Sequence, residues 1–262
     1  MRAVWRVRVL GRLAGGVVLT GFSGTLVESL VVSRLGGWLH DAKPKPFAVS
    51  PLFAGGRPVL DGAALGQGTE VEFRVGFADE LLALRFVDSL SGGVTLFGKP
   101  LELAELEFRD VSSEPLPSTP CFKVEFLSPT RFAVKPLYKR RRALFDFTPR
   151  PLNLFKSAVR QGRALGLLRL GGPFLRWVYT YVALTDFGCW GKCVRTVKLL
   201  GGGVARGFVG WALYRAFGRR RLADVWRALR VAEVFNVGTG RGMGLGAVRV
   251  TPLECPGATD RG

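Results

Sequence analysis

The single histidine of the chain, His40, lies in the segment WLHDAKPKPFAVSPLF, and Lys43 and Lys45 follow it closely. An imidazole titrates near neutral pH and can give or take a proton, while an ammonium group stabilises developing negative charge. Pro44 and Pro46 exclude a helix after His40, so the two lysines lie on a stiff loop. We therefore interpret this segment as a candidate site for cleavage of a phosphodiester.

No other catalytic set competes with His40 in the sequence. Metal-dependent nucleases need clustered carboxylates, and the second half of the chain has only scattered acids. A GxSxG motif is absent, and the close cysteine pair in CWGKC (189–193) has no histidine beside it, so we expect no metal site and no cofactor. RNA carries its own nucleophile, the 2′-hydroxyl, so acid–base groups alone would suffice.

A glycine-rich segment, VGTGRGMGLGA, occupies residues 237–247. Five of its glycines alternate with other residues, namely Gly238, Gly240, Gly242, Gly244 and Gly246. Backbone without side chains can approach a ligand closely and leave N–H groups for phosphate oxygens, and Arg241 adds a positive charge. The alternative is a plain turn between a helix and a strand.

The same segment contains GMGLGA, which satisfies the dinucleotide-binding pattern G-x-G-x-x-A. That pattern requires a strand before it and a helix after it. Here a helical pattern precedes the glycines and a strand pattern follows them. We therefore do not predict dinucleotide binding.

The positive charge lies in one half of the chain. The whole chain has 38 basic and 20 acidic residues, a net charge of +18. Residues 1–131 carry 14 of each sign, and residues 132–262 carry 24 basic and 6 acidic residues. This asymmetry predicts that the second half binds a polyanion. Its densest clusters are Lys139, Arg140, Arg141 and Arg142, and Arg219, Arg220 and Arg221.

Aromatic residues near these basic clusters could stack on bases or belong to the core; they are Phe145, Phe147, Trp211, Tyr214 and Trp226. The N-terminal arginines alternate with apolar residues as in a strand, and the apolar run 13–27 is short and glycine-rich. We therefore expect no signal peptide, no membrane partner and a cytoplasmic location. The scarcity of Asn, Gln, Met and Cys is typical of a thermophile, in which an intracellular disulfide would not be surprising.

The first part of the chain has the pattern of a ferredoxin-like β-α-β-β-α-β unit. Residues 3–10 alternate as a strand, and apolar residues from Leu26 to Trp38 recur at helical spacing, with Ser23 as a candidate N-cap. FAVSPLF and TEVEFRVGF predict strands, residues 78–90 predict a helix, and VTLFGKPLELAELEFRDV predicts a strand pair. We place this domain at residues 1–111, followed by a Pro- and Ser-rich linker at 112–120.

Residues 121–262 have a similar pattern. FKVEFLSPTRFAV predicts two strands around Ser128-Pro129, residues 151–170 predict a helix, and VARGFVGWALYRAF predicts a strand. An amphipathic helix over 219–235 and a final strand, AVRVTPL, flank the glycine-rich segment. The middle, 165–200, has no clear pattern. The predicted fold is α+β, with two tandem ferredoxin-like (RRM-like) domains, each an antiparallel sheet with helices on one face.

Three segments together resemble a known family. His40 followed by KPKPFAVSPLF, then FLSPTRFAV, and finally VGTGRGMGLGAVRV occur in the same order in the CRISPR-associated repeat-processing endoribonucleases of the RAMP superfamily. This resemblance implies metal-independent cutting of CRISPR repeat RNA by its 2′-hydroxyl, leaving 2′,3′-cyclic phosphate and 5′-hydroxyl ends and producing guide RNAs for antiviral defence.

The resemblance also implies roles for residues. His40 would be the general acid or base and Lys45 the electrostatic stabiliser. From their charge and backbone, we expect Lys43, the glycine-rich segment and the two basic clusters to bind the RNA. Many members place a tyrosine in the helix before the histidine, where this chain has Thr25 or Val27. The expected partners are repeat RNA and other subunits of a CRISPR effector complex, for a monomer or homodimer.

Two other interpretations remain open. A non-catalytic RAMP-type RNA-binding subunit of an effector complex would share the fold, the charge and the glycines, but would not need His40 with its lysines. A general RNA-binding protein with tandem RRM-like domains would carry the aromatic RNP signature, which this sequence lacks.

Overall fold

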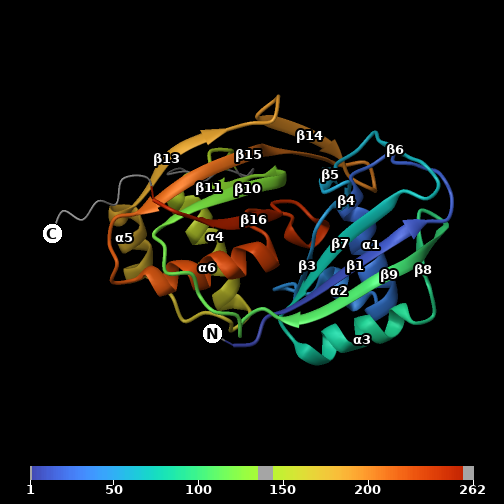
Figure 1. Ribbon diagram of the computed structural model, residues 1–262, viewed down its shortest axis with the longest axis horizontal. Helices are drawn as coiled ribbons and strands as arrows, with labels where there is room; N and C mark the ends of the chain where they lie inside the picture. The colour runs from blue at the N-terminus through green and yellow to red at the C-terminus, as the bar shows by residue number, and fades with distance from the viewer. Residues whose placement is uncertain (1, 135–143, 256–262) are drawn as a thin grey trace.

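The computed structural model describes residues 2–134 and 144–255 of the chain. Two β-sheets lie side by side, each with helices packed against it (Figure 1). We call the part through β9, which ends at Asp110, the N-terminal half, and the part from β10, which begins at Cys121, the C-terminal half. Residues 111–120, all of them described, contain neither helix nor strand.

The sheet of the N-terminal half has the strand order β5-β4-β7-β1-β9-β8, and β3 also pairs with β7. Its strands are β1 (Trp5–Leu13), β3 (Phe47–Val49), β4 (Leu52–Ala54), β5 (Arg57–Val59), β7 (Glu70–Phe77), β8 (Val94–Leu96) and β9 (Lys99–Asp110). A separate small ladder joins β2 (Val17–Val18) and β6 (Ala64–Leu65), and the helices are α1 (Ser23–Leu35), α2 (Trp38–Asp41) and α3 (Glu80–Leu90).

The sheet of the C-terminal half has the order β13-β15-β10-β16, and β14 pairs with β15. Its elements are β10 (Cys121–Thr130), β13 (Val182–Gly188), β14 (Val194–Lys198), β15 (Val204–Ala216), β16 (Val248–Leu253), α4 (Pro151–Ala164), α5 (Gly172–Tyr181), α6 (Leu222–Phe235) and the 3₁₀ turn η1 (Arg241–Met243). A separate hairpin joins β11 (Phe132–Val134) and β12 (Leu144–Asp146).

Each half places its first strand at the centre of its sheet, beside the last strand on one side and the third on the other. In the N-terminal half β1 lies between β9 and β7, and in the C-terminal half β10 lies between β16 and β15. This is the arrangement of a β-α-β-β-α-β unit. The predicted fold of two ferredoxin-like units is therefore confirmed.

The alternation of β1 explains why it occupies the centre of its sheet. Val7 and Val9 are buried in the core, while Arg6 and Arg8 lie on the other face. Arg8 pairs with Glu72 on β7 at 2.9 Å and with Glu105 on β9 at 3.0 Å. Charged side chains on the polar face of this sheet therefore form ion pairs with one another.

Three local expectations were wrong. The helix predicted through Trp38 is two helices, because it breaks at Gly36-Gly37 and leaves His40 in the one-turn α2. Ser23 is the first helical residue rather than the cap, and its hydroxyl donates to the carbonyl of Val59. The strand β10 continues through Ser128-Pro129 to Thr130, with an irregular register after Phe126.

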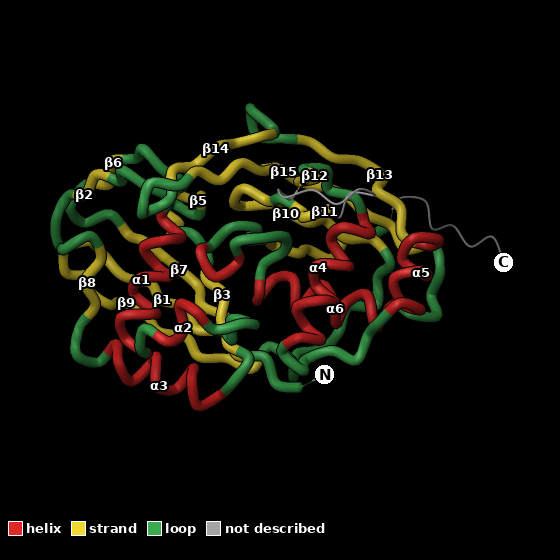
Figure 2. Tube along the Cα trace, turned by 180° about the vertical axis from the view of Figure 1, so that it is seen from behind, coloured by secondary structure: helices red, strands yellow, loops and turns green. Residues whose placement is uncertain are grey.

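The segment 165–200, which had no clear sequence pattern, forms α5 and the strands β13 and β14. Figure 2 shows α5 at the end of the C-terminal half, away from the N-terminal half. Among the described residues no helix is long and apolar enough to cross a membrane.

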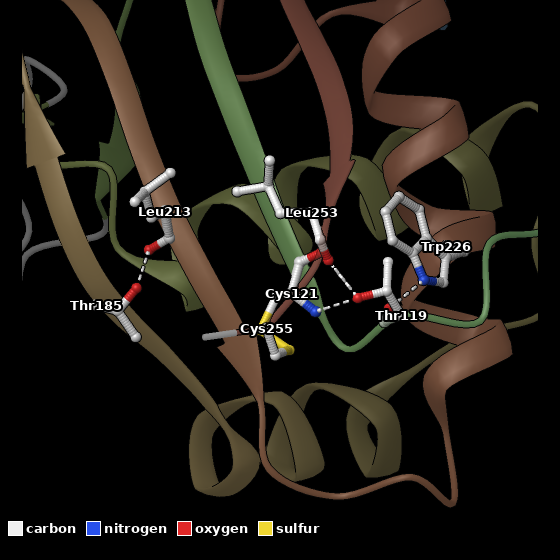
Figure 3. Close-up of a disulfide and its surroundings, with 7 residues drawn as sticks. All are labelled: Thr119, Cys121, Thr185, Leu213, Trp226, Leu253 and Cys255. Atoms are coloured by element: carbon white, nitrogen blue, oxygen red, sulfur yellow. Dashed lines mark hydrogen bonds between the residues drawn. A yellow bond between two sulfur atoms is a disulfide. The ribbon is translucent and has the colours of Figure 1, made fainter. Parts of the chain in front are cut away.

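Two disulfides lie in the C-terminal half. Cys121 at the start of β10 is bonded to Cys255 after β16, and Cys189 is bonded to Cys193 in the connection between β13 and β14. Beside the first, the Thr119 hydroxyl donates to the carbonyl of Leu253 and accepts from the N–H of Cys121 (Figure 3). This disulfide therefore ties the start of β10 to the chain just after β16, at one end of the β10–β16 ladder.

The two halves contact each other through the C-terminal end of α6. Glu233 forms an ion pair with Arg6 at 3.1 Å, and the side-chain amide of Asn236 donates to the carbonyl of Val49 at 2.7 Å. Gly76 on β7 has no room for a side chain, because an added Cβ would lie 2.4 Å from Val234. The end of α6, which leads directly into the glycine-rich segment, is therefore anchored to the N-terminal half.

Candidate active site and RNA interface

His40 is held at the surface by its neighbour in α2. Leu39 is fully buried in the core of the N-terminal half, whereas His40 is exposed. The chain then passes through Lys43-Pro44-Lys45-Pro46 into β3, whose three residues are all buried. The histidine is thus fixed by a buried anchor on each side while its ring remains accessible.

Lys45 is oriented by a buried carboxylate. Its ammonium group pairs with Glu28 on α1, whose side chain is only 10% exposed, while that of Lys45 is 26% exposed. The same ammonium lies 5.6 Å from the ring centre of Phe47. The stem of Lys45 packs against Gly242, because a Cβ added to Gly242 would lie 2.6 Å from its Cδ. Residues from both halves therefore define the position of Lys45.

The glycine-rich segment forms a tight turn around η1. Gly238, Gly240, Gly244 and Gly246 have φ between 69° and 82°, a left-handed conformation that side chains disfavour. A Cβ on Gly246 would lie 1.8 Å from the carbonyl of Val237, and one on Gly244 would lie 2.8 Å from the Cα of Gly24 on α1. Most of these glycines thus allow the chain to pack against itself and against the N-terminal half.

This packing corrects the expectation that the whole segment offers its N–H groups to a ligand. Gly238 N–H donates to Ser157 at 2.7 Å, Gly244 N–H to the carbonyl of Arg241 at 3.1 Å, and Gly246 N–H to the carbonyl of Pro129 at 3.2 Å. Within the glycine-rich segment, residues 237–247, only the N–H groups of residues 240–242 have no hydrogen-bond partner among the described parts of the chain. The open part of the turn is therefore its centre.

Arg241 stands at that centre without a carboxylate partner among the described residues. Burial, together with a smaller contribution from the charge of Arg160 on α4, lowers the pKa of Arg241 to about 10. The guanidinium is still charged at neutral pH, so two like charges lie close together and partly out of water. Such an arrangement is stabilised by an anion.

One cleft joins these features. We call it the His40 cleft; it is lined by His40, Lys43, Lys45, Glu28, Phe47, Arg160, Gln161, Gly240, Arg241, Gly242 and Met243, with parts of their neighbours. From the N-terminal half it contains residues of the segment 40–47. From the C-terminal half it contains residues of α4 and of the turn around η1, which we call the glycine turn. A second cleft shares Arg160, Gly240 and Arg241 and continues along α4 past Lys156.

The structure does not bring all the predicted RNA-binding residues together. Gly238, Gly244 and Gly246 do not line the His40 cleft. Arg219–Arg221 precede α6, whereas the glycine turn follows it, so a helix of 14 residues, roughly 20 Å long, separates them. The cluster Lys139–Arg142 lies outside the described residues.

The comparisons with known proteins point to one family. Residues 124–248 match the model of the CRISPR-associated endoribonuclease Cas6. This match covers 125 of the 262 residues, and over this segment the chain is similar to the Cas6 family. No curated protein sequence matches the chain. The predicted resemblance to the repeat-processing endoribonucleases is thereby confirmed, and the family supports a CRISPR RNA-processing endoribonuclease.

Solved structures show the same fold over nearly the whole chain. A Cas6 product complex matches with a TM-score of 0.71 and 19% identity, covering 96% of this chain and 100% of that one. Thermus thermophilus Cas6 matches with a TM-score of 0.64 and 18% identity, covering 95% and 98%. A Cas6-related protein of Pyrococcus furiosus matches with a TM-score of 0.64 and 11% identity, covering 96% and 100%.

The sequence did not identify two residues of the cleft, Glu28 and Arg160. The candidates it offered on α1 were Val27 and Thr25. Val27 lies in the core, and Thr25 is buried with its hydroxyl donating to the carbonyl of Phe22, so neither faces the cleft. The residue of α1 that does so is Glu28, the only acid in that helix. Arg160 was one of many basic residues on a predicted helix. No sequence signal distinguished it from its neighbours, because the fold alone places it beside Arg241.

Proposed function

We propose that this chain is a Cas6-type endoribonuclease that cuts CRISPR repeat RNA without a metal ion, by attack of the 2′-hydroxyl on the adjacent phosphorus. The O2′–P bond forms and the P–O5′ bond breaks, so one proton must leave the 2′-hydroxyl and one must reach the 5′-oxygen. The products are a 2′,3′-cyclic phosphate and a 5′-hydroxyl. The observation that carries the proposal is the His40 cleft, which unites His40 and Lys45 with Arg241 and the glycine turn.

His40 is the proton-transfer group in this proposal. It is the only imidazole of the chain, it is exposed, and it lines the cleft. A positioned acid or base contributes about 10²–10⁴-fold to such a reaction.

Lys45 stabilises the charge that accumulates on the phosphorane oxygens. Glu28 acts through Lys45: its buried carboxylate holds the ammonium at the wall of the cleft and limits the positions that a long, flexible side chain would otherwise sample. Glu28 is thus a positioning residue.

Arg241, Arg160 and the N–H groups of residues 240–242 hold the RNA backbone in this proposal. Burial, and to a smaller extent the charge of Arg160, lowers the pKa of Arg241, and an anion beside the two arginines would offset both effects. Matching structures solved as a Cas6 product complex, a Cas6 substrate mimic complex and a RAMP protein binding different RNA substrates support RNA as the ligand. Lys43 lines the same cleft and adds to its charge.

The test is to incubate the protein with end-labelled repeat RNA in EDTA and to map the ends of any product. We expect a single cut with a cyclic phosphate on the upstream fragment. A cut that disappears in EDTA would contradict the mechanism. Tight binding without any cut would favour a non-catalytic RNA-binding subunit of an effector complex, which would have no use for a histidine and a carboxylate-held lysine in one cleft.

A further inference from the structure

A second surface of the C-terminal half combines exposed aromatic rings with arginines. It lies where α5 ends and β15 leads into α6, at the end of the molecule away from the N-terminal half (Figures 1 and 2). We call it the distal patch and define it by Trp177, Tyr181, Arg215, Phe217, Arg219 and Arg220. The glycine turn and His40 do not belong to it.

The rings of the distal patch are placed by the backbone. Phe217 N–H donates to the carbonyl of Tyr181 at 2.8 Å, which extends the pairing of β13 with β15 by one step. Directly opposed residues of an antiparallel pair point to the same face. Tyr181 also packs on Trp177, with ring centres 5.5 Å apart. Gly218 lets the chain turn across that indole, since an added Cβ would lie 3.0 Å from it.

These rings remain open to solvent. Phe217 is 62% exposed and Tyr181 is 43% exposed, so apolar area that would gain from burial is left uncovered. By contrast, Tyr214 and Trp226, which the sequence made candidates for base stacking, are buried in the core. The rings of the distal patch, unlike those of Tyr214 and Trp226, are therefore available for stacking.

Positive charge surrounds these rings. Arg215 lies 5.1 Å from the ring centre of Phe217. Arg219 and Arg220 are exposed, and neither forms an ion pair within the described residues, whereas the next residue, Arg221, pairs with Asp224 at 3.7 Å. Exposed rings beside unpaired arginines are the combination that binds single-stranded nucleic acid, with bases on the rings and phosphates on the cations.

We propose that the distal patch is a second RNA-binding site, which holds an unpaired stretch of the substrate RNA outside the His40 cleft. This inference rests on the proposed function for the identity of the RNA. It does not rest on the catalytic residues. The occupant is single-stranded RNA rather than a protein because the surrounding cations match a polyanion and the rings accept any base.

The experiment measures binding of a fluorescent oligouridine of about 20 nucleotides, which covers more than one single-strand site. Wild-type protein is compared with Tyr181→Ala/Phe217→Ala and with Tyr179→Ala. Tyr179 is the matched control, since it is a tyrosine of the same helix, 77% exposed, and outside the patch. We expect the double variant to bind about tenfold more weakly and the control to bind like the wild type.

A second variant, Arg219→Ala/Arg220→Ala, changes only exposed side chains, so its folding is not at stake. Losing two phosphate contacts should lower the log–log salt slope for oligouridine by about 1.4.

Two results would overturn the proposal that the distal patch binds RNA. One is an oligouridine affinity within twofold of the wild type in both folded variants, and the other is failure of the wild type to bind oligouridine. A wild-type protein that binds oligouridine through the patch but leaves repeat RNA uncut would instead contradict the proposed function. The two failures are therefore distinguishable.

Discussion

The two halves share one fold and treat charge in opposite ways. In the N-terminal half, acids and bases alternate across the polar sheet face and pair, as Arg8 does with Glu72 and Glu105. In the C-terminal half, Arg241 and Arg160 lie together, and Arg219 and Arg220 lie in solvent, none with a carboxylate partner among the described residues.

This difference separates chemistry from binding. A catalytic group needs a fixed position: the buried Leu39 and β3 on either side hold His40, and the ion pair with Glu28 holds Lys45. A polyanion site needs unneutralised cations, whose mutual repulsion is relieved only when the ligand binds. The ferredoxin-like fold therefore specifies neither catalysis nor RNA binding. Each depends on the residues that the unit carries at its surface.

The strongest test of this division is His40→Ala. We expect single-turnover cutting to fall by about 10²–10⁴-fold, because no other imidazole can replace it. RNA affinity should be unchanged, since the binding charge lies in the other half. Rapid-quench kinetics and a binding titration on the same preparation measure both. A folded variant that cuts at the wild-type rate would remove His40 from the mechanism.

Lys45→Ala should lower the cutting rate by about 10²-fold through lost stabilisation of the phosphorane charge. Glu28→Gln keeps the shape of the side chain but not its charge, and should cost about tenfold. Because Glu28 acts through Lys45, Glu28→Gln should cost nothing further in the Lys45→Ala background. Additive losses in this double-mutant cycle would show that Glu28 acts by another route.

Arg160→Ala should weaken repeat-RNA binding by about tenfold and lower the salt slope by about 0.7 if the contacted segment is single-stranded. The cutting rate at saturation should change little. The same substitution removes the neighbouring charge and so moves the pKa of Arg241 upward from about 10. Arg85→Ala is the matched control, since Arg85 is exposed on α3 of the N-terminal half. Equal effects of the two variants would contradict a specific role for Arg160.

Gly242→Ala tests the contact between the halves. The added methyl group would press on the stem of Lys45, which is flexible and can move. We expect a roughly threefold to tenfold slower cut with binding retained, because the displaced lysine stabilises the phosphorane less well. Gly92→Ala, where a Cβ would meet nothing, is the control. An unchanged rate in Gly242→Ala would mean that this contact does not position Lys45.

The smallest effect on cutting is expected from the disulfides. Cys121→Ser/Cys255→Ser opens a bond that spans 134 residues and should lower the free energy of unfolding by about 2–5 kcal/mol. Cys189→Ser/Cys193→Ser opens a bond that spans only 4 and should lower it less. Denaturant titration measures both. Cutting at moderate temperature should be unchanged, since Cys121 lies roughly 23 Å along β10 from Ser128, which contacts the glycine turn.

Much of the fold was predictable because its signals are local. Each of these signals lies within one element: the alternation in β1, the apolar spacing of α3 and α6, and the run of valines and aromatic residues in β15. The segment 165–200 was not predictable, because its two strands depend on pairing with β15 and α5 is defined by packing of Phe174 and Val178 on a core built by distant residues.

The candidate site divides in the same way. His40 and Lys45 were identified from sequence because their residue types and the prolines around them carry information within a few positions. The role of the glycine turn was only half predictable. Its alternation signals close approach of a backbone, but not that Gly244 would approach Gly24 of the same chain. That depends on how the halves dock.

The sequence by itself determined the element types, the concentration of positive charge in one half, and the imidazole and ammonium groups available for chemistry, since these are properties of composition and short-range spacing. Only the tertiary structure decided that Glu28 holds Lys45, that Arg160 accompanies Arg241 and that Arg219–Arg221 lie a helix length from the glycine turn. Glu28 and Lys45 are 17 positions apart, and Arg160 and Arg241 are 81 positions apart (241 − 160). These contacts join different elements, so they depend on how the sheets and helices pack, and no local pattern in the chain encodes them.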